Sequence, residues 1–478
     1  MQRMWASPGF WLLLQATLFL ALHGFLQGLS PRMTEDSPSY LELARGELFS
    51  REALAQKRTL GYPLFLRLLD ATGAGIAAVP VAQATLYLAS IAALHAALSG
   101  VGVHPGAAAA AVSTLFWADA TFSPHCAHVM TDCLAETLAI LSIALLLWTA
   151  GKRSSKARWI ALGLSTFACY QIRPAYQFML GFVPLAGLGF LAILAEPDEL
   201  RTRWKRHLAT LVVLAVAPWF LFCAARWALV GHFGVVSFGG SNIIGIAAQF
   251  LEPQMIERLP HGQQDEAREI HHKLLSKPGY RVPISGSYDV DVDLLDEGYN
   301  IAVWEVAYPT VRSRRVTHRA TDEALLELSW SILRQCPARY LVWMVKGVRR
   351  AFAKGLSGQF AVALLLLIAC LGILLACKLS GRRFPLSHDF GDAPGLWQLL
   401  WLSSLAAVLF AAMKVPLVVA VEPPLERYVA AAFLFAPMVP VAALLLLIAR
   451  GRSALLADHF SQQAEEEGLE SEKEDHQA

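Results

Sequence analysis

The sequence predicts an α-helical membrane protein that crosses the bilayer many times. Of its 478 residues, 55% are hydrophobic and only 16% are charged, whereas soluble proteins carry about 25% charged residues. The mean hydropathy is +0.45, and apolar stretches of about 20 residues, long enough to cross the hydrocarbon, recur along the chain. The net charge is only +2. No basic surface large enough to bind nucleic acid is therefore expected.

About ten stretches are expected to span the membrane. They cover residues 9–29, 76–99, 104–119, 132–150, 158–172, 175–194, 208–230, 359–377, 396–414 and 428–449. The fifth and sixth are joined only by YQIRPAY, in which Pro174 cannot continue a helix and favours a break. The first is expected to remain in the protein, because no small-residue cleavage site precedes the charged segment that follows it.

Basic residues between the spans predict the orientation. They cluster at 151–158, 201–207 and 378–383, and ten spans place all three stretches on one side. By the positive-inside rule this side is cytoplasmic, so both termini are expected there as well. We expect a multi-pass protein of the cell (inner or plasma) membrane. Its outer side then carries four connections, at 30–75, 116–132, 231–358 and 414–428.

The chain is expected to divide into four parts. These are an N-terminal membrane core (1–230) that includes the first outer loop, a small soluble extracytoplasmic segment (231–358), C-terminal membrane helices (359–450) and a cytoplasmic tail (451–478). The tail contains AEEEGLESEKED and few apolar residues, a composition typical of disorder. The seven cysteines show no paired framework, so the fold is not expected to depend on disulfides.

Two adjacent acids follow the first span, in SPRMTEDSPSYLELARG. Asp36 or Ser37 can cap a short helix along the outer membrane surface, with Pro38 in its first turn and Gly46 after its end. Glu35 and Asp36 then lie at the start of that helix. Either they serve only the helix, or Asp36, with Glu35 as the next candidate, is a catalytic carboxylate.

A second acidic site opens the fourth span. Asp132 begins it, and Glu136 follows one turn deeper on the same face. Ionisable groups at this depth are costly and usually functional, although Asp132 can also be a helix cap. His125 and His128 lie just before it. Spaced His and Asp side chains can hold a divalent metal ion, so Asp132 and His128 are the candidate ligands.

Basic side chains are predicted on the same outer side. Arg58, Arg173, Lys414 and Arg427 are the strongest candidates for binding a phosphate group, and Arg226, Lys346, Arg349 and Arg350 extend the set. Each of them can instead extend its charged end into the headgroup region. Several cations beside two acidic sites favour a phosphate held at the outer headgroup level.

Five segments, in this order, resemble those of a known enzyme family. They are EDSPSYLELA, RTLGYPLFL, VMTDCLAETL, APWFLFCAARWALVGHFGVVSFGGSN and ERYVAAAFLFAP. Together they resemble the GT-C superfamily of polyprenyl-phosphate-sugar-dependent glycosyltransferases. The most similar branch contains bacterial proteins like the dolichyl-phosphate-mannose protein mannosyltransferases and the aminoarabinose lipid A transferases. In RTLGYP, Leu60 replaces the first proline of the family's Arg-x-Pro-Gly-Tyr-Pro segment, and 231–358 lies outside the resemblance.

The resemblance implies transfer of a sugar from a polyprenyl-phosphate donor to a lipid, glycan or protein hydroxyl at the outer face. The family's first-loop acid corresponds to Asp36, as base or orienter, and its fourth-span acid, linked to metal or donor phosphate, to Asp132. Such a reaction needs cations for the leaving phosphate and a base for the hydroxyl. The alternatives are a transporter or lipid flippase without this chemistry, or an inactive scaffold. Transporters usually place ionisable groups near the bilayer midplane, whereas most lie at one face here.

Overall fold

The computed structural model describes residues 7–28, 30–122, 125–151, 155–286, 289–357, 393–424 and 426–450. Within these ranges the chain consists of helices and their connecting loops, and paired extended backbone is limited to two isolated β-bridges. The predicted α-helical fold class is therefore confirmed. The predicted span 359–377 and the predicted tail lie outside the described residues.

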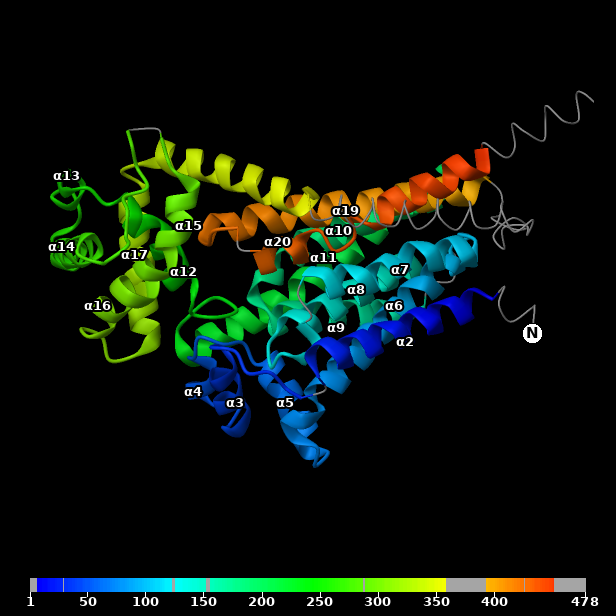
Figure 1. Ribbon diagram of the computed structural model, residues 1–478, viewed down its shortest axis with the longest axis horizontal. Coiled ribbons are helices and arrows are strands. Elements are labelled where there is room, and N and C mark those ends of the chain that lie inside the picture. Colours follow the sequence, from blue (N-terminus) through cyan, green and yellow to red (C-terminus); the bar gives the residue numbers. More distant parts are fainter. Residues whose placement is uncertain are drawn as a thin grey trace, which may run out of the picture.

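The long helices form an elongated bundle (Figure 1). They are α2 (Pro8–Gln27), α6 (Val79–Gly100), α7 (Pro105–Phe122), α8 (Asp132–Ala150), α9 (Lys156–Ile172), α10 (Met179–Leu194), α11 (Pro197–Val230), α19 (Ala393–Val421) and a helix over 438–450. Short elements connect them: α3 (Ser37–Arg45), α4 (Arg51–Leu54), α5 (Gly61–Ala71), η1 (Gly75–Ala78), η2 (His125–Ala127), η3 (Pro174–Phe178) and α20 (Glu426–Ala432).

A second group of helices forms the outer segment at one end of the bundle (Figure 1). It comprises α12 (Gly239–Ala247), η4 (Ala248–Phe250), α13 (Pro253–Ile256), α14 (His261–Leu275), α15 (Val292–Asn300), the π-helix η5 (Ile301–Ala307), α16 (Tyr308–Arg312), α17 (His318–Leu333) and a helix over 337–357. This segment has its own hydrophobic core, which continues into the outer ends of α19 and α20.

Among the described residues, five helical stretches are long and apolar enough to cross a membrane: Gly75–Gly100, Asp132–Ala150, Pro174–Leu194, Pro197–Val230 and Pro394–Val421. Three shorter apolar helices cover Pro8–Leu22, Pro105–Phe116 and Met438–Arg450. The 17-residue α9 corresponds to the fifth predicted span, 158–172. The helix lengths and compositions thus indicate a membrane protein.

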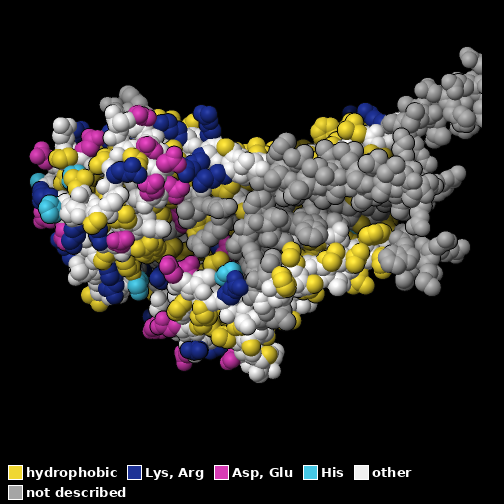
Figure 2. Space-filling model, in the orientation of Figure 1, with side chains coloured by type: hydrophobic (Ala, Val, Ile, Leu, Met, Phe, Trp, Pro, Cys, Tyr) yellow, Lys and Arg dark blue, Asp and Glu magenta, His cyan; other side chains and the backbone are white. Residues whose placement is uncertain are grey.

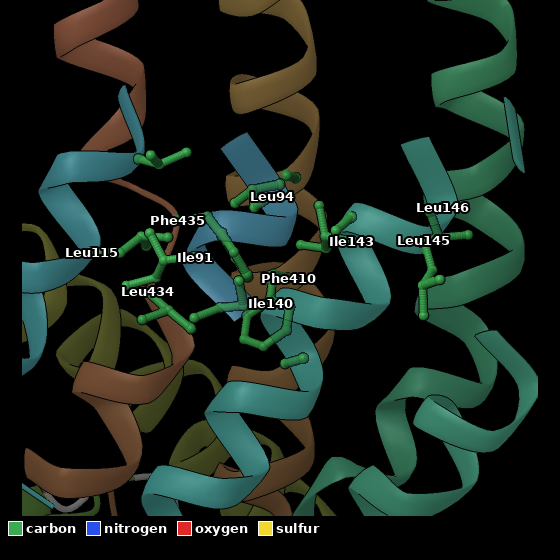
Figure 3. Packing of buried hydrophobic residues seen from close by; sticks show 14 of the residues in the cluster. Ile91, Leu94, Leu115, Ile140, Ile143, Leu145, Leu146, Phe410, Leu434 and Phe435 are labelled. Carbon is green, nitrogen blue, oxygen red and sulfur yellow. The ribbon is translucent and has the colours of Figure 1, made fainter. Parts of the chain in front are cut away.

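Helix α8 lies at the centre of the bundle. Within its most apolar 18-residue window 83% of the residues are buried, against 17% for α11. It packs on α6, α9 and α10, and its Ile140 and Ile143 belong to the cluster that includes Ile91 of α6 and Phe410 of α19 (Figure 3). The apolar surface that α11 exposes is expected of a helix that faces lipid.

Three predicted boundaries are wrong. The basic stretch 201–207 forms early turns of α11, not a loop, and residues 414–421 continue α19 rather than leaving it. The early turns of α11 extend past the apolar core because charged side chains such as Arg201 reach water. Residues 414–421 extend α19 because Val415 and Val419 pack in the core of the outer segment. The predicted span 428–449 is divided into α20, a turn at 433–437 and the helix from 438.

The predicted outer connections meet at one end of the molecule. The Arg32 amide donates to the carbonyl of Ala127 at 2.8 Å, which joins 30–75 to 116–132, and the Tyr299 hydroxyl donates to the carbonyl of Val421 at 3.4 Å, which joins 231–358 to 414–428. Charged side chains gather over the outer segment, while hydrophobic ones dominate the visible described surface of the bundle (Figure 2). The start of α2 and the end of the 438–450 helix lie at the opposite end (Figure 1).

The outer segment is fixed to the bundle by its final helix. The Tyr340 hydroxyl donates to the carbonyl of Ala420 at 2.7 Å, and Nε1 of Trp343 donates to that of Val419 at 3.0 Å. Because these carbonyls belong to the last turn of α19, they lack partners in their own helix. The outer segment therefore completes the end of a membrane helix.

Two basic residues of this final helix serve the outer segment itself. Nζ of Lys346 lies 2.9 Å from Oδ1 of Asp289, and Arg350 pairs with Asp293 and Asp296. The hypothesis that Lys346 and Arg350 bind phosphate is therefore not supported, because nearby carboxylates already neutralise them. Asp289 and Asp293 thus attach the final helix of the segment to the residues around α15.

Candidate functional site

The first outer loop is attached directly to the segment that leads into α8. The amide of Val129 donates to the carbonyl of Arg32 at 2.9 Å, and Oγ of Ser37 donates to the carbonyl of Val129 at 2.8 Å. Ser37 is the first residue of α3, so these bonds fix the start of that helix beside the start of α8. Asp36 and Asp132 are consequently brought to the same end of the bundle.

Asp36 occupies the N-cap position of α3, but its side chain makes no capping hydrogen bond. Its carboxylate instead forms an ion pair with Arg58. A charge-assisted bond to a guanidinium is stronger than a bond to a neutral amide, which explains why the predicted cap does not form. The side chain of Asp36 is 35% exposed, and that of Arg58 is 14% exposed. Asp36 is thus held in place yet remains accessible to solvent.

Arg58 is fixed by the same short helix that carries the acid. Its Nε donates to Oγ of Ser39 at 2.9 Å and its Nη1 to the hydroxyl of Tyr40 at 3.3 Å. Its guanidinium also lies 4.7 Å from the ring centroid of Tyr40. Because all three nitrogens have protein partners, Arg58 is suited to orienting Asp36 rather than to binding a phosphate.

Glu35 is the less organised of the two adjacent acids. Its side chain is exposed, and the described residues give it no ion pair. Asp36 is therefore the better candidate of the pair for a defined chemical role.

Gly61 allows the RTLGYP segment to pack on the end of α9. A Cβ at this position would lie 2.4 Å from the carbonyl oxygen of Gln171, a distance that no side chain tolerates. The neighbouring hydroxyl of Thr59 reaches the carbonyl of Ile172 at 3.4 Å. This close packing brings Arg58 and Arg173 to the same region.

A second acid–arginine pair lies deeper than the first. Nη1 of Arg173 lies 2.6 Å from Oδ2 of Asp132 and donates to Oγ1 of Thr131 at 3.0 Å. Its guanidinium lies 4.9 Å from the ring centroid of Tyr428. Burial is the largest single effect on the pKa of Arg173 and would lower it, but the Asp132 carboxylate and the neighbouring tyrosines together raise it above its ordinary value. The guanidinium is therefore charged at every working pH.

Tyr40 lies between the two pairs. It is buried, and its ring meets that of Tyr62 edge-on, with centroids 5.2 Å apart. Burial raises the pKa of Tyr40, and the charges that act on it include those of Arg58, Asp36 and Arg173. The phenol is therefore within electrostatic reach of Arg58 and Asp36 of the first pair and of Arg173 of the second.

Lys414 lies within α19, about two turns before the helix ends, and not in an outer loop as predicted. It is only 1% exposed, and its Nζ donates to the hydroxyl of Tyr176 at 3.2 Å. The carboxylates of Glu136 and Asp132 act on this cation. Lys414 extends the charged site inward.

The remaining candidates contribute less to this site. The side chain of Arg427 lies outside the described residues, although its backbone belongs to α20. Arg226 donates to the carbonyls of Leu54 and Gly234 and to the hydroxyl of Ser237. These bonds join α11 to the first outer loop, so the hypothesis that Arg226 binds phosphate is not supported.

The described residues do not provide the donors of a metal site. His128 is half-buried, and its carbonyl accepts from Nε2 of Gln83 at 3.0 Å. No group of three or more His, Cys, Asp or Glu side chains gathers in the described part of the chain. Asp132, the other predicted ligand, is already paired with a cation that would repel a metal ion. The side chain of His125 lies outside the described residues, so the divalent metal stays a prediction.

The sequence did not single out Tyr40 and Tyr428, which contact the two arginines. Their roles become clear only when segments that are distant in the sequence are brought together. Tyr428 could nevertheless have been noticed, because it directly follows the candidate Arg427. Comparisons of this chain with protein-family models, curated proteins and solved structures find no match.

Proposed function

We propose that this protein is a membrane glycosyltransferase that moves a sugar from a polyprenyl-phosphate donor to an acceptor hydroxyl at the outer face. The proposal includes ten membrane spans and cytoplasmic termini. The observation that supports it best is the meeting of two acid–arginine pairs, Asp36–Arg58 and Asp132–Arg173, beside Tyr40. The first pair is accessible to solvent, whereas the second is buried. Both lie at the end of a bundle of apolar helices.

The accessible pair suits proton transfer. Asp36, oriented by Arg58, takes the proton of the acceptor hydroxyl as its oxygen attacks the anomeric carbon of the donor. General-base assistance of this kind contributes about 10²–10⁴-fold to a rate. The bond from the anomeric carbon to the phosphate oxygen breaks, and its electron pair leaves with the polyprenyl phosphate.

The buried pair suits stabilisation of the leaving phosphate. Arg173 uses Nη1 for both Asp132 and Thr131, and no described residue forms a hydrogen bond with its Nε or Nη2. Those donors are available to a phosphate oxygen while the carboxylate keeps the guanidinium in place. Arg173 is therefore a stronger candidate than Arg58 for the donor phosphate.

The test measures release of polyprenyl phosphate, because this product forms whatever the acceptor is. The purified full chain is reconstituted in liposomes with membrane lipids, soluble glycans and a panel of labelled polyprenyl-phosphate hexoses and pentoses. Asp36→Asn should retain the fold and lose about 10²–10⁴-fold in turnover. Asp70→Asn, an exposed acid at the end of α5, is the matched control and should keep full turnover.

The same liposomes separate the enzyme from a transporter. A flippase would move the labelled donor between leaflets without cleaving it, and Asp36→Asn would then alter movement but no product. Donor translocation with no release of polyprenyl phosphate from any panel member would reject the glycosyltransferase.

A further inference from the structure

Four aromatic rings form a continuous row on the outer segment. We call Phe238, Trp304, Tyr308 and His318 the aromatic row. Phe238 and Trp304 are stacked with centroids 5.9 Å apart, Trp304 and Tyr308 are 5.7 Å apart, and Tyr308 and His318 are stacked at 6.1 Å. The rings come from three separate parts of the segment, so the tertiary fold, not a local helix repeat, assembles them.

Trp304 reaches the surface from an unusual backbone conformation, a π-helix. Trp304 is 42% exposed and lies in the π-helix Ile301–Ala307. A π-helix is rare and occurs frequently at functional sites. The neighbouring residues of the same turn, Ala302 and Val303, are buried in the core of the segment. The widened turn thus packs one face inward while Trp304 remains outside.

The aromatic row begins next to the candidate catalytic pair. The guanidinium of Arg58 lies 5.8 Å from the ring centroid of Phe238, and Nζ of Lys57 lies 6.0 Å from that of Trp304. At the other end, the charges of Lys57 and Glu42 act on His318. Polar groups from the first outer loop therefore border a set of rings from the outer segment.

This combination matches the chemistry of carbohydrates. A sugar ring presents an apolar face of C–H groups, which packs on an aromatic ring, and a rim of hydroxyls, which need polar partners. Aromatic side chains supply large rigid apolar surfaces, and a few polar groups beside them set orientation and specificity. An aliphatic patch would lack the flat surface, and a purely charged one would lack the apolar contact.

We propose that the aromatic row is a subsite that binds sugar residues of a carbohydrate-bearing acceptor and directs the acceptor hydroxyl toward Asp36. The role in transfer rests on the proposed function, whereas the binding of sugar does not. A lipid-surface role for Trp304 is the competing explanation, because tryptophans also collect at membrane interfaces.

Binding is measured with the full chain in lipid nanodiscs on an array of hexose, hexosamine and heptose oligosaccharides, followed by titration with the strongest binder. Trp304→Ala should weaken binding at least 10-fold, and Trp304→Phe, which keeps a ring, should restore most of it. Trp330→Ala is the control, because Trp330 is 45% exposed on α17 of the same segment but lies outside the row. Equal affinity in Trp304→Ala and wild type, or no binding to any glycan, would overturn the proposal.

Three further measurements separate the possible failures. Asp36→Asn should bind the oligosaccharide with wild-type affinity. If this variant loses transfer but keeps binding, the defect lies in catalysis and not in the subsite. Trp304→Ala should raise KM for the acceptor far more than it lowers kcat. Brominated lipids should quench wild type and Trp304→Phe to the same extent, because the ring faces water. Loss of quenching in Trp304→Phe would show that Trp304 inserts into the membrane, and this result would reject the subsite.

Discussion

Nη1 of Arg173 lies 2.6 Å from Oδ2 of Asp132, so the acid that opens α8 is neutralised by the cation that follows α9. The two side chains are only 12% and 2% exposed. Removing one member of a buried pair leaves the other charge without compensation, which costs more than the pair itself contributes. The pair therefore supports the fold as well as the proposed phosphate site.

Arg173→Gln should destabilise the protein by about 3–5 kcal/mol because Asp132 is then left buried and charged. Asp132→Asn leaves Arg173 uncompensated and should also destabilise it. The double variant should recover part of the loss, and a double-mutant cycle of unfolding in detergent measures the coupling. Strictly additive effects would show that the two side chains do not depend on each other.

Arg58→Lys should lower turnover although it keeps the positive charge. A single ammonium group cannot reproduce the fork that contacts Asp36, Ser39 and Tyr40. Loss of charge-assisted hydrogen bonds worth about 1.5–3 kcal/mol corresponds to roughly 10–150-fold. Release of polyprenyl phosphate measures the effect. Arg67→Lys on α5, where Nη2 contacts only the carbonyl of Gly46, should have wild-type turnover, and equal rates in both variants would contradict the role of Arg58.

Gly240→Ala should destabilise the outer segment. The added Cβ would lie 2.0 Å from the carbonyl oxygen of Asp322 and 2.7 Å from the amide nitrogen of Leu326, so α12 and α17 must separate. Overpacking of this kind typically costs about 1–3 kcal/mol. Protease resistance of the segment measures the change. Gly239→Ala is the matched control, because a Cβ there meets no atom within 4 Å, and similar losses in both variants would contradict the packing argument.

Stability should carry a pH-dependent contribution from Asp322. Burial raises its pKa above the ordinary 3.8, against the opposing effect of hydrogen bonds from Ser241. The folded chain therefore binds more protons than the unfolded chain between the two pKa values, and this contribution to stability falls as pH rises through that window. Asp322→Asn keeps an oxygen acceptor for Ser241 and removes the titration.

The comparison is thermal unfolding of wild type and Asp322→Asn between pH 4 and pH 7. The stability of the variant relative to wild type should increase with pH across this range. Glu327→Gln, an exposed acid on the same helix, should show no such trend. A wild-type advantage that grows with pH would reverse the sign and reject the assignment.

The proposed orientation is checked by cysteine labelling in intact cells. Gly262→Cys places a thiol at an exposed position with open space around it, and an impermeant reagent should label it from outside. Ser471→Cys in the tail should react only after the membrane is permeabilised. The parent protein gives the background from native cysteines. Labelling of Ser471→Cys in intact cells would reverse the topology.

The parts of the fold that depend on local chemistry could be predicted from the sequence. α8 begins at Asp132, and the break at Pro174 separates α9 from α10, as expected from an apolar run and a helix breaker. The boundaries of α11 and α19 could not be obtained this way. Hydropathy shows where the hydrocarbon lies, but not how far a helix continues beyond it.

The candidate site was predictable only as a set of residues on one side. Asp36, Arg58, Arg173 and Asp132 do meet, but their pairing depends on close packing at Gly61 and on the bridge between Arg32 and His128. Those contacts join residues that are far apart in the chain and leave no periodic signal. For the same reason the aromatic row could not be recognised before its three segments were placed together.

The contact between Lys414 and Tyr176 joins positions 238 residues apart. During synthesis, Glu136 and Asp132 therefore leave the ribosome long before the lysine that acts on both of them. A chain that ends before residue 393 lacks the lysine that acts on Glu136 and Asp132. Such a charge imbalance is destabilising, and marginally stable chains are removed by cellular proteases. We therefore expect incomplete copies of the protein to be less stable, and more readily degraded, than the full chain.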